Sequence, residues 1–173
     1  NKDITDFDEK NWTNINVEGV SAYTKSKTIA ERAAWDFVAK NPSIKLSTIN
    51  PVLVWGPAIG NHSNSTSLII CRMLMYKDMP MIPRMKVPIV DVRDVAKAHI
   101  SSIENDHSIG NRFLLCENTY WMKDISLKMK KMGYNSPTIV APDIIIKFLS
   151  NFDSTLKEAS SKLGYDYSIK SNF

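Results

Sequence analysis

Two residues one helical turn apart, Tyr23 and Lys27, carry the side chains in this sequence best suited to chemistry. They lie in a segment, residues 21–38, where Ala30, Ala34 and other apolar residues recur at helical spacing. Residues four apart lie one above the other on a helix, so the phenol and the ammonium group share a stripe with the two alanines. We therefore expect both side chains to point into the protein, where Lys is rare unless it is paired.

A phenol beside an ammonium group can transfer protons in carbonyl or alcohol chemistry. An isolated Tyr hydroxyl has a pKa of about 10 and is nearly inert as an acid or base at pH 7. A cation within about 4–6 Å favours the phenolate and suits the group to general acid–base catalysis. The spacing alone is weak evidence, because an amphipathic helix with one Lys extended toward solvent has the same pattern.

The pattern of helices and strands around this pair is that of an α/β protein. The first helix ends at Asn41-Pro42, since Pro disfavours the helical conformation of the residue before it. A β-prone segment, residues 45–50, follows and is bounded by Pro51. Further strands are expected at 87–90 and 111–116, further helices at 63–75, 120–132, 143–150 and 153–163, and a loop over 1–20.

Three other polar side chains are candidates for chemistry that we interpret as structural. Asp91 and Asp94 stand three residues apart at the start of an expected helix, where an N-cap and a first-turn carboxylate are favoured. His99 falls on the apolar face of the same segment and is expected to be a core or rim histidine rather than a base.

Composition narrows the class of protein. The chain has 173 residues, of which 43% are hydrophobic and 23% charged, as in an ordinary globular domain. The net charge of +4 comes from scattered basic residues, so no nucleic-acid partner is expected. No apolar run reaches the ~18 residues of a membrane span, and no signal peptide is evident; a cytoplasmic protein without a membrane partner is the expectation. Cys71 and Cys116 lack metal-ligand spacing, so no metal site is expected.

Three segments together resemble a known family. They are Tyr-x-x-x-Lys followed by Thr-Ile-Ala-Glu-Arg-Ala-Ala-Trp, then Ile-Asn-Pro-Val-Leu-Val-Trp-Gly-Pro at 49–57, then Val-Asp-Val-Arg-Asp-Val-Ala-Lys-Ala-His at 90–99. In order and separation they resemble the extended short-chain dehydrogenase/reductases of the NAD-dependent epimerase/dehydratase superfamily, in the dihydroflavonol-reductase-like branch. Residues 8–12 also resemble the acidic-Trp segment before that family's catalytic helix; a solvated loop with one anchoring Trp fits them equally.

The resemblance implies a fold. It implies the C-terminal portion of a doubly wound, Rossmann-like parallel sheet plus a small α/β substrate lobe. Residues 1–173 then form a single partial domain. Residues 1–60 end the Rossmann-like core and carry the catalytic helix, and residues 61–173 form mostly the substrate-binding lobe, with parts returning to the core. Methionines would help wall the substrate cleft, or equally fill a loosely packed core patch: Met73, Met75, Met79, Met81 and Met85.

The resemblance also implies a site for an NAD(P)H-dependent oxidoreductase that reduces an aldehyde or ketone. Tyr23 and Lys27 would be the catalytic pair and would also contact the cofactor. Pro51 and Val54 would seat the nicotinamide. Thr66 and Ser67 would contact cofactor phosphate or ribose from a helix start, although a plain N-cap explains them slightly better. The expected cofactor is NADP, with NAD left open, and the expected partner is a small-molecule carbonyl substrate.

One part of the family pattern is missing. The 6 glycines do not form the fingerprint that lets backbone approach a pyrophosphate, and no strand carrying the family's catalytic Ser or Thr precedes Tyr23. The sequence thus resembles the second half of a family member without the N-terminal dinucleotide-binding half, and that half or a homodimer partner is a possible partner. Two alternatives stay open: a non-catalytic remnant or interaction module of the same fold, and a sugar-nucleotide epimerase/dehydratase, for which Arg72 and Arg84 are thin support.

Overall fold

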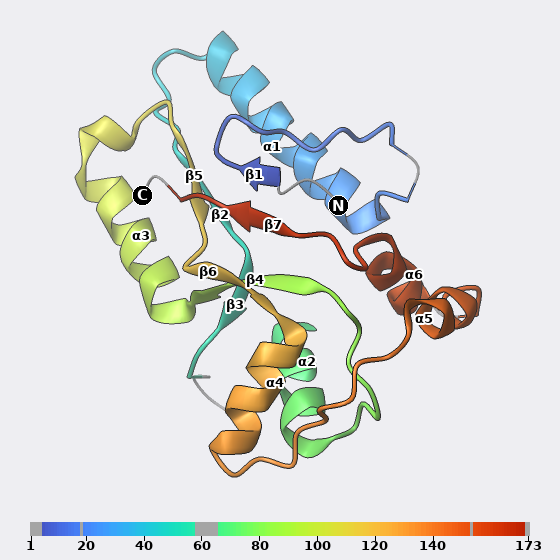
Figure 1. Ribbon diagram of the computed structural model, residues 1–173. Coiled ribbons are helices and arrows are strands. Elements are labelled where there is room, and N and C mark those ends of the chain that lie inside the picture. The colour runs from blue at the N-terminus through green and yellow to red at the C-terminus, as the bar shows by residue number, and fades with distance from the viewer. Residues whose placement is uncertain (1–4, 18, 58–65, 153, 172–173) are drawn as a thin grey trace.

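The computed structural model describes residues 5–17, 19–57, 66–152 and 154–171 (Figure 1). The strands are β1 (Thr5–Phe7), β2 (Thr48–Pro51), β3 (Leu53–Trp55), β4 (Lys86–Asp91), β5 (Arg112–Leu115), β6 (Asn118–Trp121) and β7 (Tyr167–Ile169). The helices are α1 (Ala22–Lys40), α2 (Thr66–Tyr76), α3 (Val92–Glu104), the short η1 (Asp106–Ser108), α4 (Met122–Lys131), α5 (Asp143–Leu149) and α6 (Ser154–Ser161).

Parallel strand pairs form the centre of the molecule. β2 pairs in parallel with β5, and β3 pairs in parallel with β4, which also takes β6 as an antiparallel neighbour. Only Val52 separates β2 from β3, and its N–H donates to the Leu115 carbonyl at 3.1 Å, so one continuous path crosses from the first pair to the second (Figure 1). The predicted α/β class with parallel strands is confirmed.

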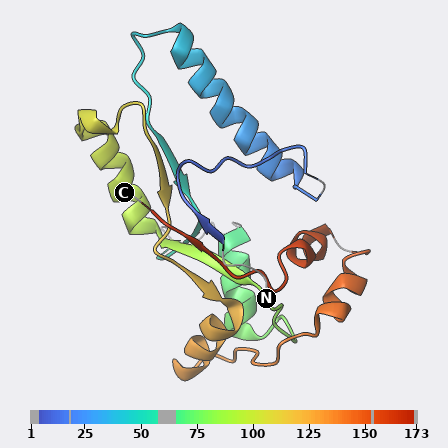
Figure 2. The same cartoon turned by 45° about the horizontal axis from the view of Figure 1, so that its top comes forward.

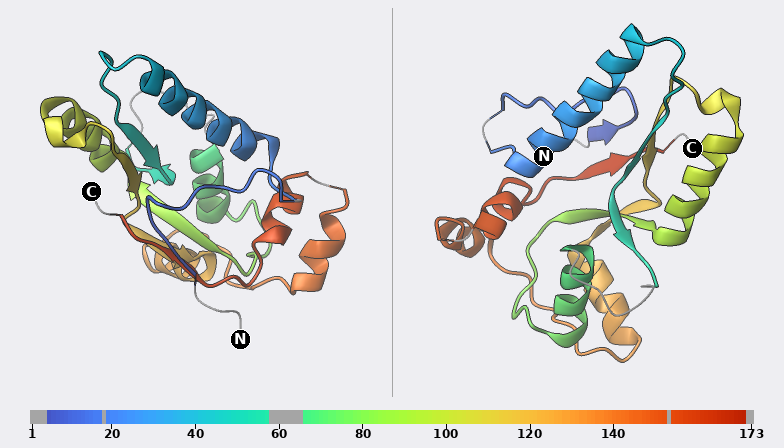
Figure 3. Two further views of the ribbon diagram at one scale, coloured as in Figure 1. Left: turned by 90° about the horizontal axis from the view of Figure 1, so that it is seen from above. Right: turned by 180° about the vertical axis from the view of Figure 1, so that it is seen from behind.

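Helices cover both sides of the β2–β5 pair. α1 and α3 lie on opposite sides of it (Figure 2, Figure 3). α1 runs antiparallel to β2, so its N-terminal end lies toward the carboxyl end of that strand (Figure 1). Ligands of open α/β sheets bind at the carboxyl ends of parallel strands. The fold therefore brings the Tyr23 end of α1 toward the edge where a ligand is expected.

Local sequence signals define the ends of α1. Ser21 is the N-cap, and its hydroxyl accepts from the Thr24 N–H at 3.2 Å. The helix ends at Lys40, before Asn41 and Pro42, as predicted. Asp91 likewise caps α3 and accepts from the Arg93 N–H at 2.8 Å, and Asp94 lies in the first turn. The interpretation of these two carboxylates as helix-terminal residues is confirmed.

Some predicted element bounds are wrong. Residues 1–20 were expected to be loop, but Thr5–Phe7 form β1, which pairs in parallel with β7. Tyr120 and Trp121 were expected to start a helix, but they end β6 because they pair with Val87 and Lys86 across the sheet. α4 begins only after them. The predicted start of α2 at Ser63 lies outside the described residues.

Two groups of buried side chains form the main core. The first lies between the β3–β4–β6 sheet and helices α2 and α4: Leu74, Ile82, Val87, Ile89 and Met122. Met79 and Met85 pack against this group, as a core role for the methionines predicts. The second group lies between the central strands and α3: Val90, Ala98 and Leu115. No helix in the described part of the chain combines the length and the apolarity needed to cross a bilayer.

Replacing Leu74 by Ala should destabilise the protein strongly. Leu74 is fully buried in the first group, so Leu74→Ala leaves a cavity and should lower the free energy of unfolding by about 3 kcal/mol in urea titrations. Ile69 lies on the same helix and is 48% exposed, and the control Ile69→Ala should cost less than about 1 kcal/mol. Equal losses for the two variants would contradict this assignment of the core.

Candidate functional site

Tyr23 and Lys27 lie together, but on the exposed face of α1. The Lys27 Nζ atom is 5.6 Å from the centroid of the Tyr23 ring, a cation–π contact. Tyr23 is 71% exposed and Lys27 is also exposed, so the expectation that both point into the protein is wrong. The buried face of the helix carries Thr28 and Glu31 instead. Two small alanines offer little apolar area to bury, whereas Glu31 gains a charged partner on the sheet.

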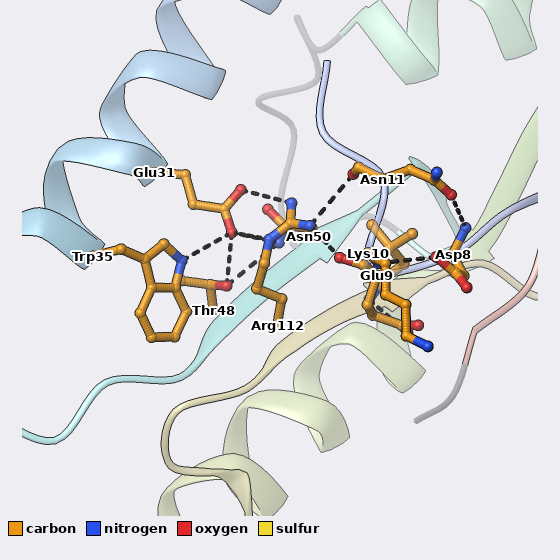
Figure 4. Close-up of polar contacts among 10 residues, drawn as sticks. Asp8, Glu9, Lys10, Asn11, Glu31, Trp35, Thr48, Asn50 and Arg112 are labelled. Carbon is orange, nitrogen blue, oxygen red and sulfur yellow. Dashed lines mark hydrogen bonds and ion pairs between the residues drawn. The ribbon is translucent and has the colours of Figure 1, made fainter. Parts of the chain in front are cut away.

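Glu31 is the centre of a polar cluster that joins α1 to two strands (Figure 4). Its Oε1 accepts from Arg112 Nε at 2.7 Å and its Oε2 accepts from Arg112 Nη2 at 3.0 Å, a bidentate pair. Oε1 also accepts from Thr48 Oγ1 at 2.8 Å and Asn50 Nδ2 at 3.2 Å, both on β2. Trp35 Nε1, one turn along the helix, donates to the same oxygen at 3.4 Å. One carboxylate thus ties the helix to β2 and β5.

The segment before α1 covers the other side of Arg112. The guanidinium carbon lies 3.8 Å from the centroid of the Trp12 ring, and Arg32 approaches the same ring at 5.4 Å. Arg112 Nη1 donates to the Glu9 carbonyl, and Glu9 Oε1 accepts from the Leu114 N–H at 3.3 Å. Trp12 therefore anchors its segment, and only 15% of the Arg112 side chain and 13% of the Glu31 side chain are exposed.

The environment keeps Glu31 ionised. Burial raises the pKa of the carboxyl group, but hydrogen bonds from Arg112, Thr48 and Asn50 outweigh burial and lower that pKa from 4.5 to about 2. A charge-assisted bidentate pair is also the most directional contact that a carboxylate makes. The cluster is therefore a fixed structural joint at neutral pH rather than a proton-transfer site.

The other residues predicted to contact the cofactor lie in β2, β3 and α2. Pro51 ends β2 and is exposed, directly after Asn50 of the polar cluster. Val54 is half-buried in β3 and pairs in register with Val90. Thr66 and Ser67 are the first two residues of α2, and their side chains lie outside the described part of the structure.

Sequence reasoning missed Glu31 and Arg112, although a signal was present. Residues 111–116 were interpreted as a buried strand, and Arg112 is the only charged residue in it. A cation in such a strand requires a partner, since charged side chains are seldom buried unpaired. Glu31, one turn beyond Lys27 in the helix expected over residues 21–38, was a candidate partner for that cation.

The two cysteines are unsuited to nucleophilic chemistry, and His99 makes a contact within its own helix. Burial raises the pKa of the Cys71 and Cys116 thiols, which disfavours the reactive thiolate. His99 Nδ1 contacts the Val95 carbonyl at 2.8 Å within α3. This histidine is exposed on the surface of α3 rather than buried in the core.

Comparison with known proteins defines the family. A model of the NAD dependent epimerase/dehydratase family matches residues 2–116. The match covers more than half of the chain, and the chain belongs to this family, as the resemblance predicts.

Similar proteins are reductases or oxidoreductases. The chain is 34% identical over 122 residues to the NADPH-dependent methylglyoxal reductase Gre2 of Saccharomyces cerevisiae, covering 66% of this chain and 36% of that protein. It is 33% identical over 175 residues to an uncharacterised oxidoreductase of Schizosaccharomyces pombe, covering 93% and 51%. The crystal structure of yeast Gre2 complexed with NADPH matches 94% of this chain and 58% of that chain, with a TM-score of 0.67 and 26% identity. The chain thus spans about a third to a half of the curated relatives' length, and a partial Rossmann-like fold is confirmed.

Removing the charge of Glu31 should change both the stability and its pH dependence. Because the pKa of Glu31 in the folded protein, about 2, is below its ordinary value of 4.5, its stabilisation is present above pH 4.5 and is lost as the pH falls toward 2. Glu31→Gln should lower the free energy of unfolding at pH 7 by about 3 kcal/mol. It should also flatten the decline in stability between pH 5 and pH 2, measured by urea unfolding at several pH values.

Asp36 provides a matched control for that experiment. It is an exposed carboxylate on the same helix, and Asp36→Asn should leave the stability within about 0.5 kcal/mol of the wild type. A Glu31→Gln variant with the wild-type pH dependence would contradict the ionised pair.

Proposed function

We propose that this protein is an NADPH-dependent reductase of small aldehydes or ketones, with Tyr23 and Lys27 as its catalytic pair. The observation that carries the proposal is the contact of an accessible phenol with an ammonium group, 5.6 Å from Nζ to ring centroid, at the end of α1 that faces the carboxyl ends of parallel strands. Relatives with the same fold are NADPH-dependent reductases, Gre2 among them.

The residues present fit a nicotinamide cofactor. Lys27 forms no ion pair with the described residues, so its ammonium group is available to donate to ribose hydroxyls. Pro51 is exposed at the carboxyl end of β2, where its ring can pack against a planar nicotinamide, and the Val54 backbone follows three residues on. Thr66 and Ser67 begin a helix, a position that suits phosphate.

The chemistry of these residues is proton transfer and charge stabilisation. NADPH, when bound, supplies the hydride that the carbonyl carbon accepts. The Tyr23 hydroxyl donates its proton to the carbonyl oxygen, which becomes the alcohol oxygen. Lys27 stabilises the negative charge that develops on the Tyr23 oxygen, and solvent returns the proton. The sum is a carbonyl compound, NADPH and a proton converted to an alcohol and NADP⁺.

Binding the pyrophosphate of the cofactor requires residues other than those named so far. The 173 residues contain no glycine-rich dinucleotide fingerprint. We therefore propose that a polypeptide segment outside these residues supplies those contacts. Activity assays consequently belong with the protein as its gene encodes it, with methylglyoxal and isovaleraldehyde, the substrates in the name of the yeast relative, as first probes.

Tyr23→Phe should abolish the reduction. It removes the proton donor and keeps the ring that contacts Lys27, so kcat should fall by about 10²–10⁴-fold in assays of NADPH consumption. Tyr134 lies after α4, and the control Tyr134→Phe should keep the wild-type rate. Wild-type turnover by Tyr23→Phe would remove Tyr23 from the mechanism. A wild type without NADPH binding or turnover would favour a non-catalytic member of the family instead.

Lys27→Ala should weaken cofactor binding as well as catalysis. Losing the ammonium group removes a charge-assisted hydrogen bond to the ribose, so the Kd for NADPH, followed by fluorescence, should rise by about 10-fold. Lys25→Ala, on the same helix, should leave that Kd unchanged. Equal affinities for the Lys27→Ala variant and the wild type would exclude Lys27 from the cofactor site.

A further inference from the structure

We propose that Glu31 is a positioning residue, which fixes the helix carrying Tyr23 and Lys27 against the strand carrying Pro51. The inference deepens the proposed function and rests on it. The two parts of the site belong to different elements, and reduction requires that the proton donor and the hydride donor meet the same carbonyl group.

The contacts of Glu31 reach both parts of the site. Along α1 it lies one turn beyond Lys27, on the same continuous helix. Across to β2, its Oε1 accepts from Thr48 at 2.8 Å and from Asn50 at 3.2 Å. Asn50 directly precedes Pro51. A displacement of the carboxylate therefore moves Tyr23 and Lys27 relative to Pro51, the last residue of β2.

Arg112 fixes the carboxylate in orientation as well as in position. Its Nε and Nη2 atoms donate to the two Glu31 oxygens at 2.7 and 3.0 Å, which sets the plane of the carboxylate (Figure 4). The guanidinium carbon of Arg112 also lies 3.8 Å from the centroid of the Trp12 ring, and Arg112 Nη1 donates to the Glu9 carbonyl. Little freedom is left for α1 to rotate or to slide along β2.

Glu31 acts through this geometry and not as an acid or base. Its carboxylate accepts from residues on both strands, and it stays ionised over the neutral pH range. Its removal should therefore change the rate of the chemical step and leave the shape of the pH profile unchanged. Since about 1 Å of misplacement costs about 10²-fold in rate, a modest shift of α1 is enough for a measurable effect.

The experiment compares two Arg–carboxylate pairs of this protein. Glu31→Gln and Arg112→Lys disturb the proposed positioning pair. Arg84→Lys disturbs a second bidentate pair, from Arg84 to Asp143, which joins the segment before β4 to the start of α5 and involves neither α1 nor β2. Each variant of the protein as its gene encodes it is assayed with NADPH and methylglyoxal for kcat, both KM values and the pH profile. The isotope effect is measured with NADPH deuterated at the transferred position.

Glu31→Gln and Arg112→Lys should lower kcat by about 10–100-fold, raise the isotope effect on kcat because hydride transfer becomes rate-limiting, and keep the KM for methylglyoxal within about 3-fold. Arg84→Lys should keep kcat within about 2-fold and leave the isotope effect unchanged. Thr48→Val, nearly isosteric, removes one donor to Glu31 and provides a milder test, with an expected loss of about 2–5-fold, should the charge variants fold poorly.

Three outcomes overturn the inference, and they separate the positioning role from the proposed function. An active wild type whose folded Glu31→Gln and Thr48→Val variants keep kcat and the isotope effect refutes the positioning role alone. The same holds if Arg84→Lys loses as much kcat as Glu31→Gln, because the loss then reflects general destabilisation. A wild type that neither binds NADPH nor reduces methylglyoxal or isovaleraldehyde refutes the proposed function, and the inference with it.

Discussion

A nearly buried carboxylate that must be paired is the constraint on which the arrangement of α1 depends. Leaving one charge of such a pair without its partner costs several kcal/mol. Leaving a few apolar side chains partly exposed on the opposite face of the helix costs less free energy than that. α1 consequently turns Glu31 toward Arg112, although Ile29 and Phe37 then stay 52% and 57% exposed. The same rotation leaves Tyr23 and Lys27 accessible, so the ion pair decides which side chains can meet a ligand.

The parallel strands add the second half of this arrangement. Because β2 continues into β3 through Val52, Pro51 lies where one strand path changes its partner from β5 to β4. Pro51 is the last residue of β2, and ligands of open α/β sheets bind beyond the carboxyl ends of parallel strands. α1, held by Glu31, and the strand path from β2 to β3 meet at one edge of the molecule. Membership of the epimerase/dehydratase family agrees with a ligand site at that edge.

Local signals in the sequence predicted the elements better than their orientation. The C-terminal end of α1 follows from Asn41-Pro42, and the cap of α3 follows from Asp91, because each signal acts within a few residues. The inward face of α1 was predicted wrongly from Ala30 and Ala34, since spacing reports periodicity but not which face has the stronger partner. β1 and β7 were not predicted at all: three-residue strands have almost no period, and their pairing joins distant parts of the chain.

The β1–β7 pair has a consequence for the order of folding. Thr5 stands opposite Tyr167, and Asp6 forms an ion pair with Lys170 at 2.7 Å. Closing so long a loop costs entropy before any contact repays it, and contacts of this separation slow folding. On the ribosome, the segment that includes Trp12 emerges long before β7, at about 5–20 residues per second. The pairing of β1 with β7 can therefore form only when synthesis of these residues is nearly finished, and nascent chains stalled earlier present β1 without this neighbour.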